Sequence, residues 1–282
     1  MGSDMTISPN FESQSSFRYS FSFLPKDQRV ALNTVYAFCR TTDDIVDNEG
    51  EKDRKVILLQ KWRIELGKAL QNGSEFQLLN QLAHIADKFN IPVQHFYELI
   101  EGVEMDLMKS RYQTFDELKH YCYLVASSVG LMSVKIFGSI NERIAKYAEN
   151  LGIALQLTNI LRDIKADAKV NRIYLPQEDL HQFGYNEGEI FNSVYNSNFI
   201  DLMKFETQRA EDYYNLAKES LRPEDKKYLF APKIMERIYY HTLLRIKGND
   251  YNVYKKSMRL PHTLQLLIAF KYLLKYRLMK TV

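Results

Sequence analysis

Proline and glycine are scarce in this chain, and their placement constrains its fold more than any other feature. The 282 residues include 11 glycines and 7 prolines, and the spans 26–91 and 93–175 contain no proline. Within these spans apolar residues recur at steps of three and four, as at Leu32, Val35 and Cys39, which is the period of an amphipathic helix. No segment bounded by hairpin turns shows the alternation of apolar and polar residues that is typical of a β-strand. The sequence therefore predicts an all-α protein of roughly eight to ten helices.

Helix start signals locate four of these helices along the chain. A proline or an acidic or amide side chain at the first turn is typical of a helix N-terminus. No repeat or shift in composition divides the chain, so we expect a leader over residues 1–12 and one domain over 13–282. The predicted helices begin at residues 24–27, at 90–94 (through Met108), at Asp116-Glu117 (through Ile136) and at Asn141-Glu142 (through Asp167).

Composition and charge exclude several classes of function. The chain has neither a GxGxxG nor a GxxxxGK[ST] motif, so a glycine-rich phosphate loop is not its main chemistry. A formal charge of +3 and a pI near 8.6 are too mild to indicate nucleic-acid binding. Two cysteines give no disulfide framework or metal spacing, which favours a cytoplasmic setting.

The C-terminal segment leaves two interpretations open. Its longest apolar stretch, Leu264 to Phe270, is interrupted by Gln265 and is too short to span a bilayer. The surrounding basic residues, Lys255, Lys256, Arg259 and those within 271–280, form either a solvated face or a peripheral contact with an anionic membrane.

The first motif with a chemical implication is the segment from Arg40 to Asp47, which reads Arg-Thr-Thr-Asp-Asp-Ile-Val-Asp. On a helix, Asp43 and Asp47 are four residues apart and share a face. A solvated acidic helix end is the simpler interpretation, but acids near a helix C-terminus oppose its macrodipole. Mg²⁺ binds carboxylate oxygens and completes its shell with water and substrate phosphates. The motif alone does not decide between the two.

A second polar stripe favours the metal interpretation. Residues 151–167 are mostly apolar, yet Gln156, Asn159, Asp163 and Asp167 recur at helical spacing, with Arg162 beside them. Burying such groups is costly unless each has a partner. An internal hydrogen-bond network is one solution and a second Mg²⁺–diphosphate site is the other. Two such helices in one chain favour two metal–diphosphate sites, in which Mn²⁺ could replace Mg²⁺.

Several segments resemble the squalene/phytoene synthase family over nearly the whole chain, from about Ser16 to the region of Leu267. This resemblance implies an all-α isoprenoid synthase bundle around a central cavity. It also implies a prenyltransferase that joins two all-trans prenyl diphosphates head to head (1-1′) with Mg²⁺. The segments are Ser16-Phe17, Arg40 to Asp47, Tyr121-Cys-Tyr-x-Val-Ala, Gln156 to Asp163, and Asn171-Arg-Ile-Tyr-Leu-Pro.

Within the family, residues 131–138 and 231–239 look most like bacterial presqualene diphosphate synthases of the hopanoid branch. We therefore expect two farnesyl diphosphates to give presqualene diphosphate or a squalene-type product. The alternative is a phytoene or dehydrosqualene synthase of carotenoid synthesis. The sequence does not decide between C15 and C20 substrates, whether NADPH is used, or whether the chain is a monomer or a homodimer.

The resemblance also implies roles for individual residues. Either Tyr123 or released diphosphate would accept the proton, and Phe17 and Phe21 would line the cavity. Tyr239 would lie near the first diphosphate. The predicted site comprises catalytic Tyr36, Arg40, Tyr123 and Arg162, substrate-binding Ser16, Phe17, Phe21, Gln156, Asn159, Arg172, Tyr174 and Tyr239, and metal-binding Asp43, Asp47, Asp163 and Asp167.

The chain departs from the family pattern at two places. Ser127 stands where a glycine is usual, and Lys165-Ala166 replaces the usual Gly-Glu inside the second aspartate motif. We expect the Ser127 hydroxyl to narrow the cavity wall near Tyr123, four residues earlier, and to favour release of the cyclopropyl intermediate.

Two other functions are compatible with an all-α chain of this kind. One is a different enzyme of the same fold, a head-to-tail prenyl synthase or a terpene cyclase. The block from Asn159 through Pro176 speaks against it. The other is a non-catalytic helical assembly factor, against which the four intact aspartates of the two motifs speak.

Overall fold

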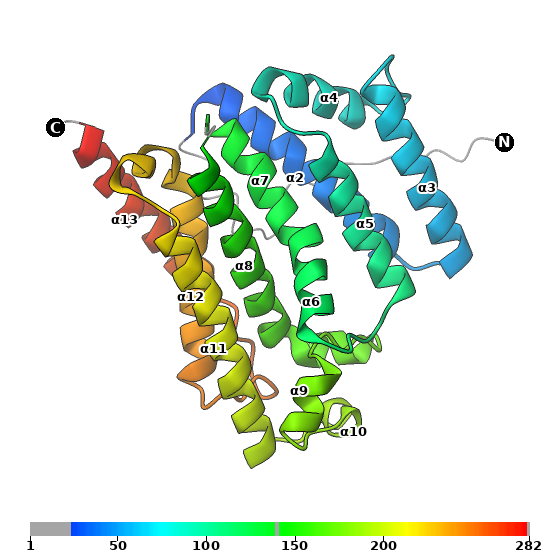
Figure 1. Cartoon of the computed structure of the whole chain (residues 1–282), viewed down its shortest axis with the longest axis vertical. Coiled ribbons are helices and arrows are strands. Elements are labelled where there is room, and N and C mark those ends of the chain that lie inside the picture. The colour runs from blue at the N-terminus through cyan, green and yellow to red at the C-terminus, as the bar shows by residue number, and fades with distance from the viewer. Residues whose placement is uncertain (1–23, 139–140, 281–282) are drawn as a thin grey trace.

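The structure, a computed structural model, describes residues 24–138 and 141–280, and these form helices joined by loops (Figure 1). The expected leader over 1–12 lies outside these residues. No described helix is both long enough and apolar enough to cross a membrane. The α-helices are α2 (Lys26–Asp47), α3 (Lys52–Ala69), α4 (Gln77–Phe89), α5 (Gln94–Met108), α6 (Phe115–Cys122), α7 (Ser128–Ile136), α8 (Glu142–Lys169), α9 (Gln177–Gln182), α10 (Glu187–Phe191), α11 (Ser197–Glu219), α12 (Phe230–Lys247) and α13 (His262–Lys280).

The all-α prediction is confirmed, and the described residues contain more helices than expected. The predicted starts near Pro25, Gln94, Asp116 and Glu142 each agree with the structure to within about two residues. The excess comes from two sources. Helices α9 and α10 span only six and five residues, too short to show a hydrophobic period. The helix expected from Asp116 to Ile136 is divided by a π-helical turn at Tyr123–Ser127.

Helix α8 forms the centre of the bundle. The Asn141 side chain caps its N-terminus by accepting hydrogen bonds from the backbone N–H groups of Arg143 and Ile144. Helices α11 and α12 pack against it on one side, and α7 with the π-turn packs on the other (Figure 1). Because neighbours surround its middle, residues 151–161 of α8 are mostly buried and apolar, whereas Gln156 and Asp167 face the candidate site.

The buried apolar residues form two main clusters. One surrounds α8 and α11 and includes Leu157 and Phe199. The other joins α2 to α5 and α7 around Trp62, whose ring stacks on Phe38 at a centroid distance of 6.1 Å. Helices α2 and α5 of the second cluster face α8 of the first, and the candidate site lies where the two meet.

The π-turn is held between two glycines. A Cβ atom added to Gly152 on α8 would lie 2.5 Å from Ser127 Cα, and one added to Gly102 on α5 would lie 2.6 Å from Val125 Cγ1. A π-turn inserts one residue and shifts the side chains after it around the helix. The Ser127 hydroxyl therefore donates to the backbone carbonyl of Glu149 at 2.6 Å, and its side chain is fully buried.

This arrangement predicts opposite effects for alanine at two helical glycines. Gly152→Ala is expected to lower the free energy of unfolding by about 1–3 kcal/mol, because the new methyl group overlaps the backbone of the π-turn. Gly67→Ala on α3 is the matched control, since its Cβ would lie 3.5 Å from Tyr97 Oη. We expect it to raise stability by roughly 0.5–1 kcal/mol through helix propensity. Urea unfolding of both variants tests the pair, and a stabilising Gly152→Ala would contradict the close approach.

Candidate active site between the acidic helices

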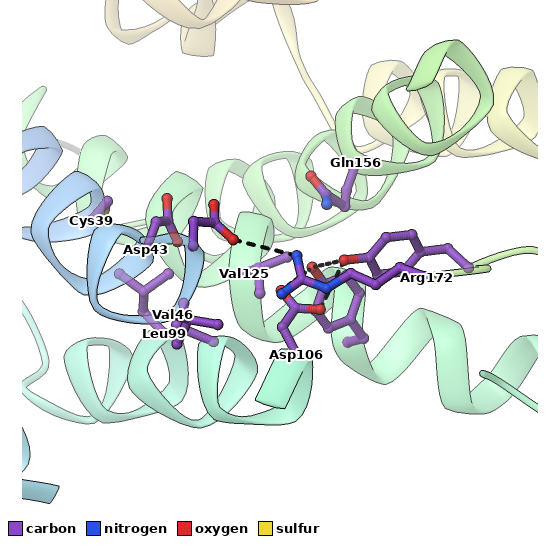
Figure 2. Close-up of a pocket in the computed structure, with 12 residues that line it drawn as sticks. Cys39, Asp43, Val46, Leu99, Asp106, Val125, Gln156 and Arg172 are labelled. Carbon is purple, nitrogen blue, oxygen red and sulfur yellow. Dashed lines mark hydrogen bonds and ion pairs between the residues drawn. The ribbon is translucent and has the colours of Figure 1, made fainter. Parts of the chain in front are cut away.

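The C-terminal turns of α2 carry three aspartates, of which Asp43 and Asp47 face the candidate site and Asp44 does not. Asp43 and Asp47 line a cavity of about 250 Å³ together with Val46 and the buried Cys39 (Figure 2). Asp44 is not among the residues that line it, and its carboxylate pairs with Arg40 at 2.8 Å. The α2 face predicted from the four-residue spacing is therefore the face at the cavity.

Two residues predicted to be catalytic on α2 do not line the cavity. The side chain of Arg40 is 63% exposed in its pair with Asp44. Tyr36, one turn earlier, is half-buried. Neither residue belongs to the cavity lining, so a direct contact of Arg40 with bound substrate would require this pair to open.

A buried carboxylate that the sequence analysis missed lies opposite α2. Asp106 on α5 lines the cavity and accepts hydrogen bonds from two tyrosine hydroxyls, Tyr121 at 3.0 Å and Tyr174 at 2.8 Å (Figure 2). The sequence contained a signal: Asp106 is three residues after Val103 and seven after Leu99, so it continues an apolar, buried stripe.

Three tyrosine rings form a cluster at this carboxylate, in which the ring of Tyr174 stacks on those of Tyr112 and Tyr121. Tyr121 and Tyr174 lie 5.2 Å apart between ring centroids, and Tyr112 lies 5.5 Å from Tyr121 and 5.8 Å from Tyr174. The hydroxyl of Tyr112 is buried without a hydrogen-bond partner among the described residues. Only two of the three hydroxyls are therefore bound to Asp106, although all three rings form one cluster.

Arg172 lies between the acidic groups of the two halves. Its Nη1 donates to Asp47 Oδ1 at 3.3 Å, and Figure 2 shows its guanidinium beside Asp106. Arg172 and Tyr174 also line an adjoining small cavity with Asp167 of α8. One arginine thus faces both the α2 pair and the end of the α8 stripe.

The segment that carries Arg172 and Tyr174 is fixed at both ends. Its start is tied to α8 because the Arg172 backbone N–H donates to the Asp167 carbonyl at 2.9 Å. Its other end leads into α9, where Asp179 receives two hydrogen bonds from Arg209 on α11, at 2.7 and 3.2 Å. The buried Arg209–Asp179 pair therefore holds the segment against the bundle.

The polar side chains of the α8 stripe find only some of their hydrogen-bond partners among the described residues. Gln156 lines the cavity and accepts a hydrogen bond from Asn159 Nδ2 at 3.2 Å. The other amide atom, Asn159 Oδ1, is buried without a partner among the described residues. An internal network therefore does not account for the whole stripe, and a bound group would remove the cost of the unpaired oxygen.

The next turn of α8 carries a cation next to an acid. Arg162 donates through Nε to Asp163 Oδ1 at 2.9 Å and through Nη2 to the other oxygen. Arg259 approaches the same carboxylate at 3.8 Å. Tyr239 on α12 hydrogen-bonds with Arg162, so it lies by the second acidic motif and not by the first, where it was expected.

Three aspartates of the candidate site have pKa values above the ordinary value of an aspartate. Burial and the nearby carboxylates of Asp47 and Asp106 raise the pKa of Asp43 to about 7. Burial and Asp163 raise the pKa of Asp167 to about 7. Burial also raises the pKa of Asp106, against the lowering effects of Arg172 and the two hydroxyls. Each shift thus arises first from burial of a carboxyl group, and the charge of the buried carboxylates is not fully balanced by the cations nearby.

The acidic pairs have the oxygen donors of a site for a hard cation that takes its remaining ligands from water and substrate. Among the described residues no group of three or more His, Cys, Asp or Glu side chains forms an ion cage. Mg²⁺ binds through one or two carboxylates and takes waters and substrate phosphates as its other ligands. Asp43 with Asp47 fits this donor set. Asp163 with Asp167 offers the same oxygens, but Asp163 would first have to give up its contacts with Arg162.

Three of the remaining predicted residues lie outside the described part of the chain: Ser16, Phe17 and Phe21. A fourth, Tyr123, lies in the π-turn and does not line the cavity. Its hydroxyl hydrogen-bonds with Glu98, which together with burial raises the pKa of Tyr123. Tyr121, two residues earlier, occupies the position at the cavity that was expected for Tyr123. Ser127 does not line the cavity either, because its hydroxyl is bound to Glu149.

An all-α bundle in which two acidic helices reach adjoining cavities is the architecture of the isoprenoid synthase class. Residues 12–265 match the family model for squalene/phytoene synthase. The chain belongs to the squalene/phytoene synthase family and is a prenyltransferase that condenses prenyl diphosphates head to head.

Relatives and solved structures lie on different branches of this family. The 15-cis-phytoene synthase of Synechococcus elongatus is 35% identical, with 88% of this chain and 86% of that protein covered. Phytoene synthase 2 of Solanum lycopersicum is 36% identical over 84% of this chain and 78% of its own length. A crystal structure of a dehydrosqualene synthase superposes with a TM-score of 0.80 at 26% identity, covering 93% of this chain and 92% of that one. The squalene synthase HpnC of Alicyclobacillus acidocaldarius gives 0.76 at 28% identity over 84% and 89%.

Proposed function

We propose that this protein is a phytoene synthase: it joins two C20 prenyl diphosphates 1-1′ and carries the reaction through to the conjugated triene without a reductant. The observation that carries this choice is the 35–36% identity to phytoene synthases over most of the chain. A squalene-type product was the first expectation from the sequence. Part of its support was a Ser127 hydroxyl at the cavity, and that hydroxyl is bound to the Glu149 carbonyl instead.

In this proposal the two acidic pairs hold the diphosphates through Mg²⁺. Asp43 and Asp47 would bind ions at one diphosphate, and Asp163 and Asp167 at the other. When bound, Mg²⁺ neutralises the leaving diphosphate and polarises its C1–O bond. Arg172 lies between the pairs and is free to exchange its weak contact with Asp47 for a phosphate oxygen, a geometry that suits a guanidinium.

The tyrosines are suited to the cationic stage that follows departure of the diphosphate. Asp106 accepts the protons of the Tyr121 and Tyr174 hydroxyls, so the oxygen lone pairs are left to face other groups. Lone pairs and ring faces stabilise a nearby carbocation, and a hydroxyl proton would repel it. The Tyr121 hydroxyl is therefore placed to accept the proton that is lost when the cyclopropane closes, while its own proton passes to the Asp106 carboxylate. Released diphosphate is the alternative acceptor.

A C15 substrate is the second candidate. The dehydrosqualene synthase structure superposes over nearly the whole chain, and the analogous product from farnesyl diphosphate would form through the same steps. The proposed reaction also yields a hydrocarbon that is insoluble in water. We therefore propose that the enzyme works in peripheral contact with a membrane.

The test is an incubation of the purified full chain with Mg²⁺ and either geranylgeranyl or farnesyl diphosphate, with and without NADPH. We expect a C40 triene from the C20 substrate, in equal yield with and without NADPH, by mass spectrometry. Presqualene diphosphate or squalene as the main product would refute the phytoene assignment. Linear longer diphosphates or cyclised alcohols would refute 1-1′ coupling by this chain. No turnover of either substrate would favour the non-catalytic assembly factor.

A further inference from the structure

The C-terminal helix α13 carries apolar residues on two sides. Its inner side packs on α12, where Ile268 and Ala269 join a cluster with Ile234 and Ile238. Figure 1 shows α13 at the edge of the bundle, beside α12. Most exposed leucines on a protein surface are isolated, but here several lie on one helix.

The outer side of α13 forms a continuous stripe. The spacing of these residues, one, four and eight positions after the first, keeps them on one helix face. No described residue covers this face, because each side chain is about half or more exposed. The outer stripe comprises Leu266 (46% exposed), Leu267 (63%), Phe270 (55%) and Leu274 (48%).

The chain around the outer stripe is strongly basic. From residue 251 to the C-terminus it contains seven Lys or Arg and no Asp or Glu, although the whole chain has a formal charge of only +3. The remaining residues are therefore net acidic, and the basic charge is concentrated at this end. In the described part, Lys255, Lys256, Arg259 and Lys271 are all exposed.

We propose that α13 is an interfacial helix, which inserts the outer stripe into the surface of an anionic lipid bilayer while the basic residues contact the headgroups. An apolar helix face with a basic flank and no acids is the pattern that binds such surfaces. A second copy of this chain fits less well. A twofold interface through the stripe would bring two equally basic segments together.

The position of the stripe connects the bilayer to the site. Arg259, three residues before α13 begins at His262, approaches Asp163 of the second acidic motif at 3.8 Å. A helix lying in the headgroup region would thus have its leading segment in contact with the candidate active site. The benefit of delivering a hydrocarbon to lipid rests on the proposed function, but the binding itself does not.

The test is co-sedimentation of the full chain with vesicles of phosphatidylcholine alone and of phosphatidylcholine mixed with phosphatidylglycerol. The wild-type chain is expected to bind the anionic vesicles more strongly, and high salt should weaken that binding. The double variant Leu267→Glu/Phe270→Glu is expected to bind at least about tenfold more weakly, because it places carboxylates in the apolar layer.

A matched control separates the stripe from net charge. Ile57→Glu/Ile64→Glu on α3 adds the same charge at residues that are 64% and 60% exposed, and we expect it to bind nearly as the wild type does. Equal loss in both variants, or no preference of the wild-type chain for anionic vesicles, would overturn the proposal.

Two further measurements identify other occupants of the stripe. A lower melting temperature for the α13 variant than for the α3 control would show that other residues of the same chain already cover the stripe. A wild-type dimer that the variant converts to a monomer, seen by light scattering, would show a second copy there. Either result would overturn the lipid assignment. Sedimentation requires no turnover, so an inactive or squalene-forming enzyme would leave this test intact.

Discussion

Replacement of Asp43 by asparagine is expected to lower kcat by at least about a hundredfold, because the amide cannot replace a carboxylate as a ligand of a hard cation. The same change removes one of three carboxylates that crowd the cavity, beside Asp47 and Asp106. Without Mg²⁺ the variant should therefore be as stable as the wild type or more so. Loss of turnover without loss of stability distinguishes a functional acid from a structural one.

Thermal unfolding provides a readout that does not depend on turnover. Mg²⁺ together with inorganic diphosphate should raise the melting temperature of the wild-type chain, since ligands of the folded state stabilise it. We expect no such rise for Asp43→Asn. The matched control is Asp44→Asn, which changes the next residue on α2, paired on the outer side with Arg40. Nearly full activity in Asp43→Asn, or equal losses in both variants, would contradict the assignment of the cavity face.

The positions of the acids on α2 were partly predictable from helical spacing. The four-residue step correctly put Asp43 and Asp47 together at the cavity. It could not settle the position of Arg40, because a residue three before Asp43 is also four before Asp44. The structure resolves this competition in favour of the exposed pair with Asp44. The helical period predicts which residues share a face, but it does not decide which of two equally near acids an arginine pairs with.

The π-turn accounts for a second difference between expectation and structure. An unbroken α-helix from Asp116 to Ile136 would place Tyr123 and Ser127 on one face. The five residues Tyr123–Ser127 are instead wound as a π-helix, so Tyr121 and Val125 line the cavity while Ser127 turns to α8. This change depends on glycines at 102 and 152, on two other helices. Local sequence therefore carried no sign of it.

Asp106 could have been recognised from the sequence, but its partners could not. Its place on the apolar stripe of α5 marks a buried acid, and such an acid needs hydrogen-bond donors. Those donors come from α6 and from the segment after α8, which are distant in the chain. The family resemblance supplied Tyr174 as a substrate-binding residue, whereas the fold shows it donating to Asp106 at 2.8 Å.

The tyrosine cluster predicts a large effect at this carboxylate. Asp106→Asn is expected to lower kcat by at least about a hundredfold. The carboxylate accepts from Tyr121 at 3.0 Å and from Tyr174 at 2.8 Å. An amide accepts through its oxygen alone, so one of the two hydroxyls would have to accept from the amide and turn its own proton away. That proton would oppose a carbocation, and Arg172 would also lose a neighbouring negative charge.

Tyrosine variants separate the hydroxyls from the rings. Tyr121→Phe and Tyr174→Phe keep the stacked cluster but each remove one donor to Asp106, and we expect activity to fall roughly tenfold or more in each. Tyr112→Phe is the matched control, because its ring packs against the other two while its buried hydroxyl has no partner among the described residues. Removing an unsatisfied buried hydroxyl should leave kcat near the wild-type value. It should also raise the free energy of unfolding by up to about 1 kcal/mol. Steady-state kinetics and urea unfolding of all three variants check this, and equal loss of activity in Tyr112→Phe would show that the rings, and not their hydrogen bonds to Asp106, support the reaction.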